Sequence, residues 1–242
     1  MKSIFKLVIV FFFTSIALSC SEEDNDITQL ATIKVINIIN GVPRVIVKTG
    51  TNPIQYATTE AKIDFNAFSN FTVKASINSE VEVVSESDTL NPIYSESLNL
   101  KPGIHSLYLY GFSGSEEGLL IEDNVKQFTD SLVGVRFVNL SKTAGPIDIE
   151  VPEENTISVS GLDFQSASDY IAFPAKKADG SYTFEFRGLS GNLLSRFTLD
   201  PLDMDNINKD VSTKKNLTLV LRELDFGFPF GVRNTVIRIN NY

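Results

Sequence analysis

The chain has 242 residues, a formal net charge of −9 and 43% hydrophobic residues, with one Cys, one His and no Trp. Such a chain is too apolar to be disordered, so a packed, acidic protein is expected. Because Cys20 and His105 stand alone, a disulfide scaffold and a zinc site with four Cys or His ligands are excluded. The acidic balance also argues against a nucleic-acid partner, whose recognition needs a basic surface.

The N-terminus has the pattern of an export signal. Two lysines precede an apolar run at 7–18, which is shorter than the roughly 20 residues needed to span a bilayer. Residues 17–20 (Ala-Leu-Ser-Cys) resemble the lipobox of bacterial lipoproteins, which implies cleavage before Cys20 and lipid attachment to its sulfur. We therefore predict a signal peptide at 1–19 and a mature chain anchored to a membrane by an N-terminal lipid. An ordinary secretory peptide with an incidental Cys is the alternative.

A polar, acidic stretch follows the cysteine at 21–26 (Ser-Glu-Glu-Asp-Asn-Asp). It contains nothing to bury, so residues 20–30 are predicted to form a solvated tether. The stretch also resembles the acidic signal that follows the lipidated Cys in Bacteroidetes lipoproteins of the outer leaflet. This resemblance implies an outer-membrane lipoprotein displayed at the cell surface, with a periplasm-facing position as the alternative.

From residue 31 onward, apolar residues recur mostly at a spacing of two, which is typical of β-strands. The pattern predicts strands at 33–39, 45–49, 71–77, 80–84, 106–110, around 121, and at 135–140, 147–151, 157–159, 182–187, 194–199, 217–221 and 235–239. Gly, Pro, Asn and Asp between these segments mark turns. No segment keeps a period of 3.6 residues for three turns, so we predict an all-β fold of Ig-like, Greek-key β-sandwiches.

Comparison of the sequence with itself predicts a tandem repeat. Residues 33–37 (Ile-Lys-Val-Ile-Asn) match 135–139 (Val-Arg-Phe-Val-Asn) in pattern, 71–75 align with 182–186, and 107–109 align with 219–221. The offsets between these matches predict two β-sandwich domains, at 31–130 and 131–242.

The second repeat opens with Val135-Arg-Phe-Val-Asn139 and continues with Ile147-Asp-Ile-Glu-Val151. This order is similar to the DUF4397 family of bacterial extracellular proteins, whose members open with a Val-Arg-Phe/Val-x-Asn/His strand and are often lipoproteins in Bacteroidetes. The resemblance covers most of 28–242 and is closer for the second repeat. It implies a fold and an extracellular location, and it brings no catalytic residues.

Candidate catalytic and metal-binding residues are few. His105 precedes a predicted strand, where packing or a turn hydrogen bond is the expected role, because catalysis would need a partner base or nucleophile. The acidic segment 200–210 offers oxygen ligands for Ca²⁺, but it departs from the EF-hand template and is interpreted as a solvated loop. We therefore expect no catalytic residues, no metal and no cofactor, and predict that the protein is not an enzyme.

Three aromatic residues, Phe226, Phe228 and Phe230, alternate in a segment that also contains Gly and Pro. They are predicted either to be buried at a strand bend or to form an exposed apolar loop that contacts a partner. Two triplets, 88–90 (Asp-Thr-Leu) and 130–132 (Asp-Ser-Leu), resemble the sequon for O-glycosylation of exported Bacteroidetes proteins. Thr89 and Ser131 are therefore candidate attachment sites.

These features together predict a lipid-anchored surface protein that acts as a non-enzymatic binding, adhesion or spacer module with a protein or glycan ligand. One alternative is a glycan-binding lipoprotein of a polysaccharide-uptake system, which the absence of Trp disfavours. The other is a fimbrillin-like pilus subunit, which would assemble by adding a strand to a sheet edge.

Overall fold

The computed structural model describes residues 29–49, 62–128, 132–152, 156–174, 181–199, 216–227 and 229–241. Their strands form four sheets and none of these residues lies in an α-helix, so the predicted all-β fold is confirmed. Within these ranges, no helix is long and apolar enough to cross a membrane. The predicted signal peptide at 1–19 and the lipid-attachment residue Cys20 lie outside the described residues.

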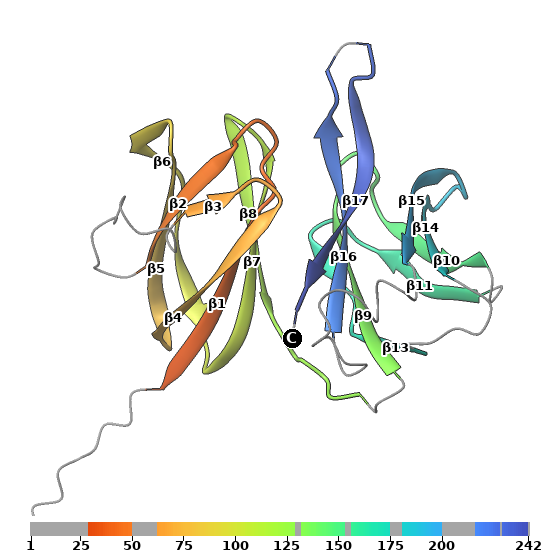
Figure 1. The fold of residues 1–242 in the computed structure, drawn as a ribbon, viewed down its shortest axis with the longest axis horizontal. Coiled ribbons are helices and arrows are strands. Elements are labelled where there is room, and N and C mark those ends of the chain that lie inside the picture. Colours follow the sequence, from red (N-terminus) through yellow and green to blue (C-terminus); the bar gives the residue numbers. More distant parts are fainter. Residues whose placement is uncertain are drawn as a thin grey trace, which may run out of the picture.

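The N-terminal half of the structure contains β1 to β8 (Figure 1). The strands are β1 (Leu30–Asn37), β2 (Arg44–Thr49), β3 (Lys62–Asp64), β4 (Ala67–Lys74), β5 (Ser76–Ser85), β6 (Asp88–Leu100), β7 (Gly103–Phe112) and β8 (Ser115–Glu122). Sheet A has the order β4-β1-β7-β8, and sheet B has the order β3-β2-β5-β6. Neighbouring strands are antiparallel except β1 and β7, which run parallel.

The C-terminal half contains β9 to β17. The strands are β9 (Leu132–Leu140), β10 (Ile147–Val151), β11 (Thr156–Leu162), β12 (Ser166–Ala167), β13 (Ile171–Pro174), β14 (Tyr182–Gly188), β15 (Leu193–Leu199), β16 (Asn216–Asp225) and β17 (Val232–Asn240). Sheet C has the order β12-β9-β16-β17, with β13 also paired to β9, and sheet D has the order β11-β10-β14-β15. Here β9 and β16 are the parallel pair.

The two halves have the same topology. The first strand of each half pairs in parallel with a later strand, β1 with β7 and β9 with β16. On the other side of the first strand, β12 and β13 together take the place that β4 has in the N-terminal half. The registers also correspond, because Val35 lies opposite Leu107 and Phe137 lies opposite Leu219. These pairs agree with two of the three matches made from the sequence.

The third match is wrong. Residues 71–74 belong to β4, which pairs with β1 in sheet A, whereas 182–186 belong to β14 in sheet D. The counterpart of β14 is β5, since both pair with the second strand of their half. A period of two marks a half-buried strand but does not identify its sheet, so two unrelated strands matched. The predicted domain boundary between 130 and 131 lies outside the described residues.

Each half buries an apolar core between its two sheets. The cluster of the N-terminal half includes Val35 and Leu107 from sheet A and Val45 and Val83 from sheet B. The cluster of the C-terminal half includes Phe137 and Leu219 from sheet C and Ile149 and Phe186 from sheet D. Two sheets packed through their inward side chains form a β-sandwich, the architecture expected from the sequence.

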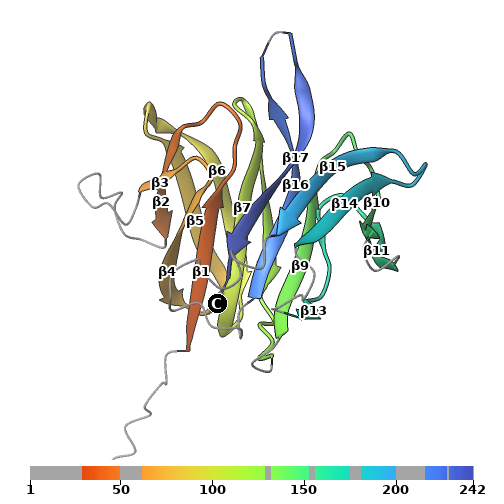
Figure 2. The same cartoon turned by 45° about the vertical axis from the view of Figure 1, so that its right-hand side comes forward.

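A third apolar cluster joins the halves. It contains Ile36, Tyr108 and Tyr110 from sheet A, Ile38 from the segment that follows β1, and Val138, Leu140, Val220 and Ile239 from sheet C. Sheets A and C therefore face each other through the sides that point away from their own cores, and Figures 1 and 2 show the halves side by side around them. As a result, the central strands β1, β7, β9 and β16 are buried on both faces.

An asparagine closes the same turn in both halves. Asn37 Nδ2 donates to the carbonyls of Ile63 (3.2 Å) and Val42 (3.4 Å), and its Oδ1 accepts from the backbone of Ile39 (3.3 Å). Asn139 Nδ2 donates to the carbonyls of Gly145 (2.8 Å) and Leu162 (3.0 Å), and its Oδ1 accepts from the backbone of Ser141 (3.1 Å). Both side chains are fully buried, so each satisfies backbone groups that water does not reach.

The substitution Asn139→Ala is expected to destabilise the protein by about 2–4 kcal/mol, because buried backbone groups lose their partners. The matched control is Asn70→Ala on the exposed side of β4, for which a change below about 0.5 kcal/mol is expected. Urea unfolding followed by far-UV circular dichroism measures both. Equal stabilities of the two variants would contradict the assigned role of Asn139.

Candidate functional site

The β16–β17 hairpin extends beyond the sheet that carries it. Pairing of β9 with β16 ends where Leu140 lies opposite Arg222, but β16 and β17 stay paired until Asp225 lies opposite Val232. The last residues of β16 and the first of β17 thus form a two-stranded ribbon, which projects from the top of the molecule in Figures 1 and 2.

Hydrogen bonds fix the loop that closes this ribbon. Phe226 N donates to the carbonyl of Gly231 (3.0 Å), and Phe230 N donates to the carbonyl of Gly227 (2.8 Å). Gly227 N donates to Asp225 Oδ1 (2.8 Å). Gly227 and Gly231 have φ values of 71° and 61°, in the left-handed region that glycine adopts without strain. The described residues of this loop are therefore held by hydrogen bonds within the loop.

Three apolar side chains are exposed on this loop. Phe226, Phe230 and Val232 have exposed fractions of 51%, 58% and 51%, and we call these three residues the hairpin tip. The guanidinium carbon of Arg233 lies 5.2 Å from the Phe230 ring centroid and so covers one of the rings. The sequence predicts either burial of the three phenylalanines at a strand bend or their exposure on an apolar loop. Phe226 and Phe230 are exposed, and Phe228 lies outside the described residues.

The other candidate residues from the sequence do not join the hairpin tip. Thr89 is half-buried at the β5–β6 turn, where Asp88 Oδ1 accepts from the backbone of Leu90 (3.1 Å), and its glycosylation stays a prediction. Ser131 and the acidic segment 200–210 lie outside the described residues. Within the part of the chain that the structure describes, no three His, Cys, Asp or Glu side chains are grouped so that they could hold a metal ion.

His105 occupies a buried position in β7. Its Nε2 atom lies 2.8 Å from the carbonyl oxygen of Lys101, at the turn that precedes the strand. This is the turn hydrogen bond expected from the sequence.

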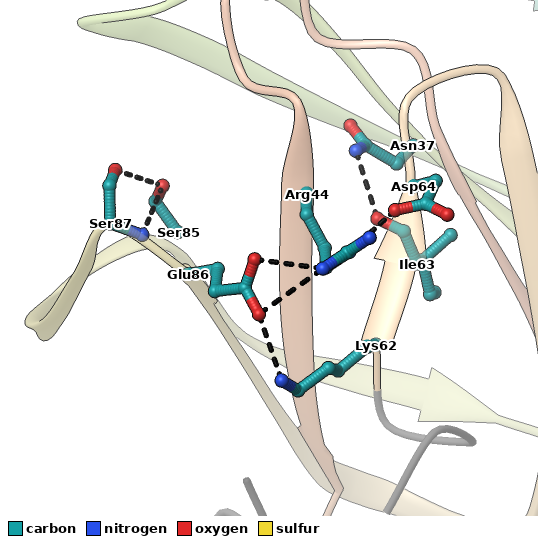
Figure 3. A network of polar contacts seen from close by, with 8 residues as sticks. All are labelled: Asn37, Arg44, Lys62, Ile63, Asp64, Ser85, Glu86 and Ser87. Atoms are coloured by element: carbon teal, nitrogen blue, oxygen red, sulfur yellow. Dashed lines mark hydrogen bonds and ion pairs between the residues drawn. The ribbon is translucent and has the colours of Figure 1, made fainter.

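A cluster of ion pairs lies on the surface near the β2–β3 edge of sheet B (Figure 3). Arg44 Nε donates to Asp64 Oδ1 (2.5 Å), and Glu86 accepts from Arg44 (3.1 Å) and from Lys62 (2.8 Å). The hydrogen bond from Lys62 and the charge of Arg44 outweigh desolvation and keep the pKa of Glu86 below its usual value. These side chains are solvent-exposed, so their ion pairs add little to the free energy of unfolding. Because they pair with one another, the cluster offers no unpaired charge to a ligand.

A buried polar network, which the sequence analysis missed, connects the two halves. Arg136 Nη1 donates to Asp123 Oδ1 (2.6 Å), and these side chains are only 3% and 0% exposed. Arg136 also donates to the hydroxyls of Tyr108 (3.2 Å) and Thr218 (3.1 Å), and Ser106 Oγ donates to Asp123 Oδ2 (2.6 Å). Asp123, Tyr108 and Ser106 belong to the N-terminal half, so Arg136 reaches across the interface. Removing one member of such a buried pair typically costs about 3–5 kcal/mol.

One feature of the sequence coincides with this network, although by itself it does not indicate burial. The matched repeat segments carry a basic residue at the same position, Lys34 in one and Arg136 in the other, between apolar neighbours. In a strand with one solvated face, such a residue points to water. Here the second face is buried against the other half, and the basic side chains are buried with it.

Comparisons with known proteins give only distant similarity. No protein-family model matches the sequence, and no curated protein matches it. Among solved structures, the chain is similar to the carbohydrate-binding module CBMbc (family CBM26) of Eubacterium rectale Amy13K in complex with maltoheptaose, with 12% identity, a TM-score of 0.26, and coverage of 88% of this chain and 97% of that chain. It is also similar to human GIVD cytosolic phospholipase A2, with 15% identity, a TM-score of 0.21, and coverage of 88% of this chain and 32% of that chain. TM-scores this low carry no weight for function, which is therefore inferred from the geometry of this chain.

The interface also contains Lys34, and its burial makes stability depend on pH. Lys34 Nζ donates to the carbonyl of Asn240 (3.1 Å), and burial lowers the pKa of Lys34 from 10.5 to about 8. Because the folded state holds this proton less tightly than the unfolded state, the charged lysine disfavours folding below pH 8. That penalty is relieved as the pH rises toward 10.5.

We expect the stability of the wild type relative to Lys34→Met to rise by on the order of 1–2 kcal/mol between pH 7 and 9.5. Urea unfolding of both proteins at the two pH values measures this difference, in which the titration of all other groups cancels. A difference that is independent of pH would show that Lys34 is not buried as a cation.

Proposed function

We propose that the chain is a lipid-anchored, non-enzymatic binding module of the cell surface whose partner covers the hairpin tip. The observation that carries this proposal is the exposure of Phe226, Phe230 and Val232 on a hydrogen-bonded loop beyond the sheet. Large apolar side chains gathered in water mark a surface that another molecule covers.

The surroundings of the hairpin tip favour a protein as the partner. Apolar side chains in the centre with charged residues at the rim, here Asp225 and Arg233, are typical of protein interfaces, in which aromatic residues and Arg supply much of the binding energy. Asp225 Oδ1 already accepts from Gly227, so the tip offers few hydrogen-bonding groups for sugar hydroxyls. The fixed loop also reduces the entropy lost on binding.

The position of the hairpin agrees with display at a surface. In Figures 1 and 2, β1 begins at the lower end of the molecule, and the β16–β17 hairpin projects from the upper end. The proposed anchor at Cys20 precedes β1 by only about ten residues, so the hairpin would point away from the membrane. Resemblance of 17–20 to a lipobox and of 135–151 to DUF4397 lipoproteins supports the same location.

The substitution Cys20→Ala is expected to release the protein from the membrane, because the acyl chains that anchor it are attached to this sulfur and to the new N-terminus. Fractionation of cells that produce the full-length protein, followed by detergent phase partitioning, measures the effect. Ser21→Ala is the control and is expected to stay in the membrane fraction. A Cys20→Ala protein that remains membrane-bound would rule out lipid anchoring.

The double substitution Phe226→Ser/Phe230→Ser is expected to abolish partner contact while changing stability by less than about 0.5 kcal/mol, because both rings are exposed. The contact is detected with a photo-reactive benzoylphenylalanine in place of Val232 in cells that display the full-length protein. Irradiation should yield a discrete protein adduct, which the double substitution removes.

The control position for this cross-linking is Leu189, an equally exposed apolar residue at the β14–β15 turn, with an exposed fraction of 62%. Identical adducts from both positions, or an adduct that survives the double substitution, would contradict the proposal. Glycan-array binding that depends on the two phenylalanines would show that the partner is a sugar and not a protein.

A further inference from the structure

A cavity lies between the two halves at the base of the projecting hairpin. It has a volume of about 220 Å³, and residues of both halves line it. Its apolar walls come from Ile38, Tyr110, Leu140 and Phe164, and its basic residues are Arg222 and Lys142. Sites for drug-sized ligands occupy about 300–1,000 Å³, so this cavity suits a smaller molecule.

Arg222 is a buried cation without a counterion among the described residues. The residue is 3% exposed, and its Nε atom is buried with no hydrogen-bond partner. Its Nη1 atom donates to the carbonyl of Ile38 (3.3 Å), and its guanidinium carbon lies 4.9 Å from the ring centroid of Phe65. Burial alone lowers the pKa of Arg222 to about 10, so the group is still charged at neutral pH.

The carboxylates in the cavity wall are engaged elsewhere. Glu117 Oε2 accepts from the hydroxyl of Tyr110 (2.9 Å) and from Gln165 Nε2 (2.9 Å). Glu223 Oε1 accepts from the backbone of Thr143 (2.6 Å). Arg222 has no ion pair with either of them in the described part of the chain.

Arg136, the other buried arginine of the interface, has the carboxylate partner that Arg222 lacks among the described residues. Arg136 has its carboxylate, Asp123, at 2.6 Å, together with the hydroxyls of Tyr108 and Thr218. A buried charge without such a partner is costly, and a planar guanidinium matches a carboxylate through two parallel hydrogen bonds. Arg222 therefore has donors for a carboxylate that the described residues do not supply.

We propose that this cavity binds a small organic acid whose carboxylate pairs with Arg222 and whose apolar body packs against Leu140 and Phe164. The apolar walls favour an organic acid over inorganic phosphate or sulfate. Lys142 is exposed, so it lies where it attracts an anion to the cavity. A free acid and the C-terminus of a peptide present the same carboxylate to Arg222, and the probes below distinguish these two sources.

Isothermal titration of the full-length protein in detergent tests the proposal, with benzoate as the probe and benzamide as its uncharged isostere. Benzoate is expected to bind and benzamide to bind at least tenfold more weakly. Acetyl-phenylalanine and its amide form a second pair of probes, and preference for this acid over benzoate assigns the site to a peptide C-terminus. Equal binding of acid and amide in both pairs, or no binding of either acid at 10 mM, would overturn the proposal.

Variants separate ligand binding from a structural role of Arg222. Arg222→Gln is expected to weaken acid binding at least tenfold, whereas Arg196→Gln, on sheet D, is expected to leave it unchanged. Should Arg222→Gln fail to fold, Ser115→Trp keeps the arginine and narrows the cavity from an exposed position in its lining. Ser115→Trp is expected to reduce acid binding to the same extent, and full binding by a folded variant of either kind would overturn the proposal.

Discussion

The burial of sheet A against sheet C is the constraint on which the rest of the structure depends. A sheet in a sandwich normally keeps one face in water, but β1, β7, β9 and β16 are buried on both faces. Apolar residues fill the middle of this interface, and the Arg136–Asp123 pair closes one end of it. Burying this ion pair costs desolvation, which offsets much of its attraction, but a change that removes one partner would leave the other charge buried and unpaired.

The interface joins equivalent surfaces of the two halves, much as an isologous dimer does. Lys34 corresponds to Arg136, Ser106 to Thr218, and Asp123 to Asn241. Ser106 donates to Asp123 (2.6 Å), and Asn241 donates to Thr218 (2.6 Å), so the same two positions are hydrogen-bonded in both halves with donor and acceptor exchanged. Only one of the two corresponding positions carries a carboxylate. Asp123 pairs directly with Arg136, whereas at Lys34 desolvation outweighs the attraction of Asp123 and lowers the pKa.

Local patterns in the sequence predict the central strands well, because alternating or continuous apolar residues report burial directly. The alternation at 147–151 predicts a strand with the same bounds as β10. No apolar pattern marks β6 (Asp88–Leu100) in the sequence. It is an edge strand with mostly polar side chains and Pro92 at a register shift, so burial has little effect on its composition. The buried Lys34, Arg136 and Arg222 could not be predicted either, since a polar residue in an alternating strand is assigned to water until a second covering surface is known.

The two ends of the interface differ because the repeats have diverged there. Arg222 corresponds to Tyr110, and both side chains line the same cavity. The tyrosine finds partners in Glu117 and Gln165, whereas the arginine has no carboxylate among the described residues. Immediately beyond this position, β7 and β8 end in a tight polar turn, while β16 and β17 continue into the ribbon that carries the hairpin tip. The buried Arg222 and the projecting hairpin tip, which both distinguish the C-terminal half, thus follow one another along β16. A ligand held by Arg222 would therefore lie at the base of the ribbon that carries the proposed contact surface, so that a change at one of these two features would be felt by the other through β16.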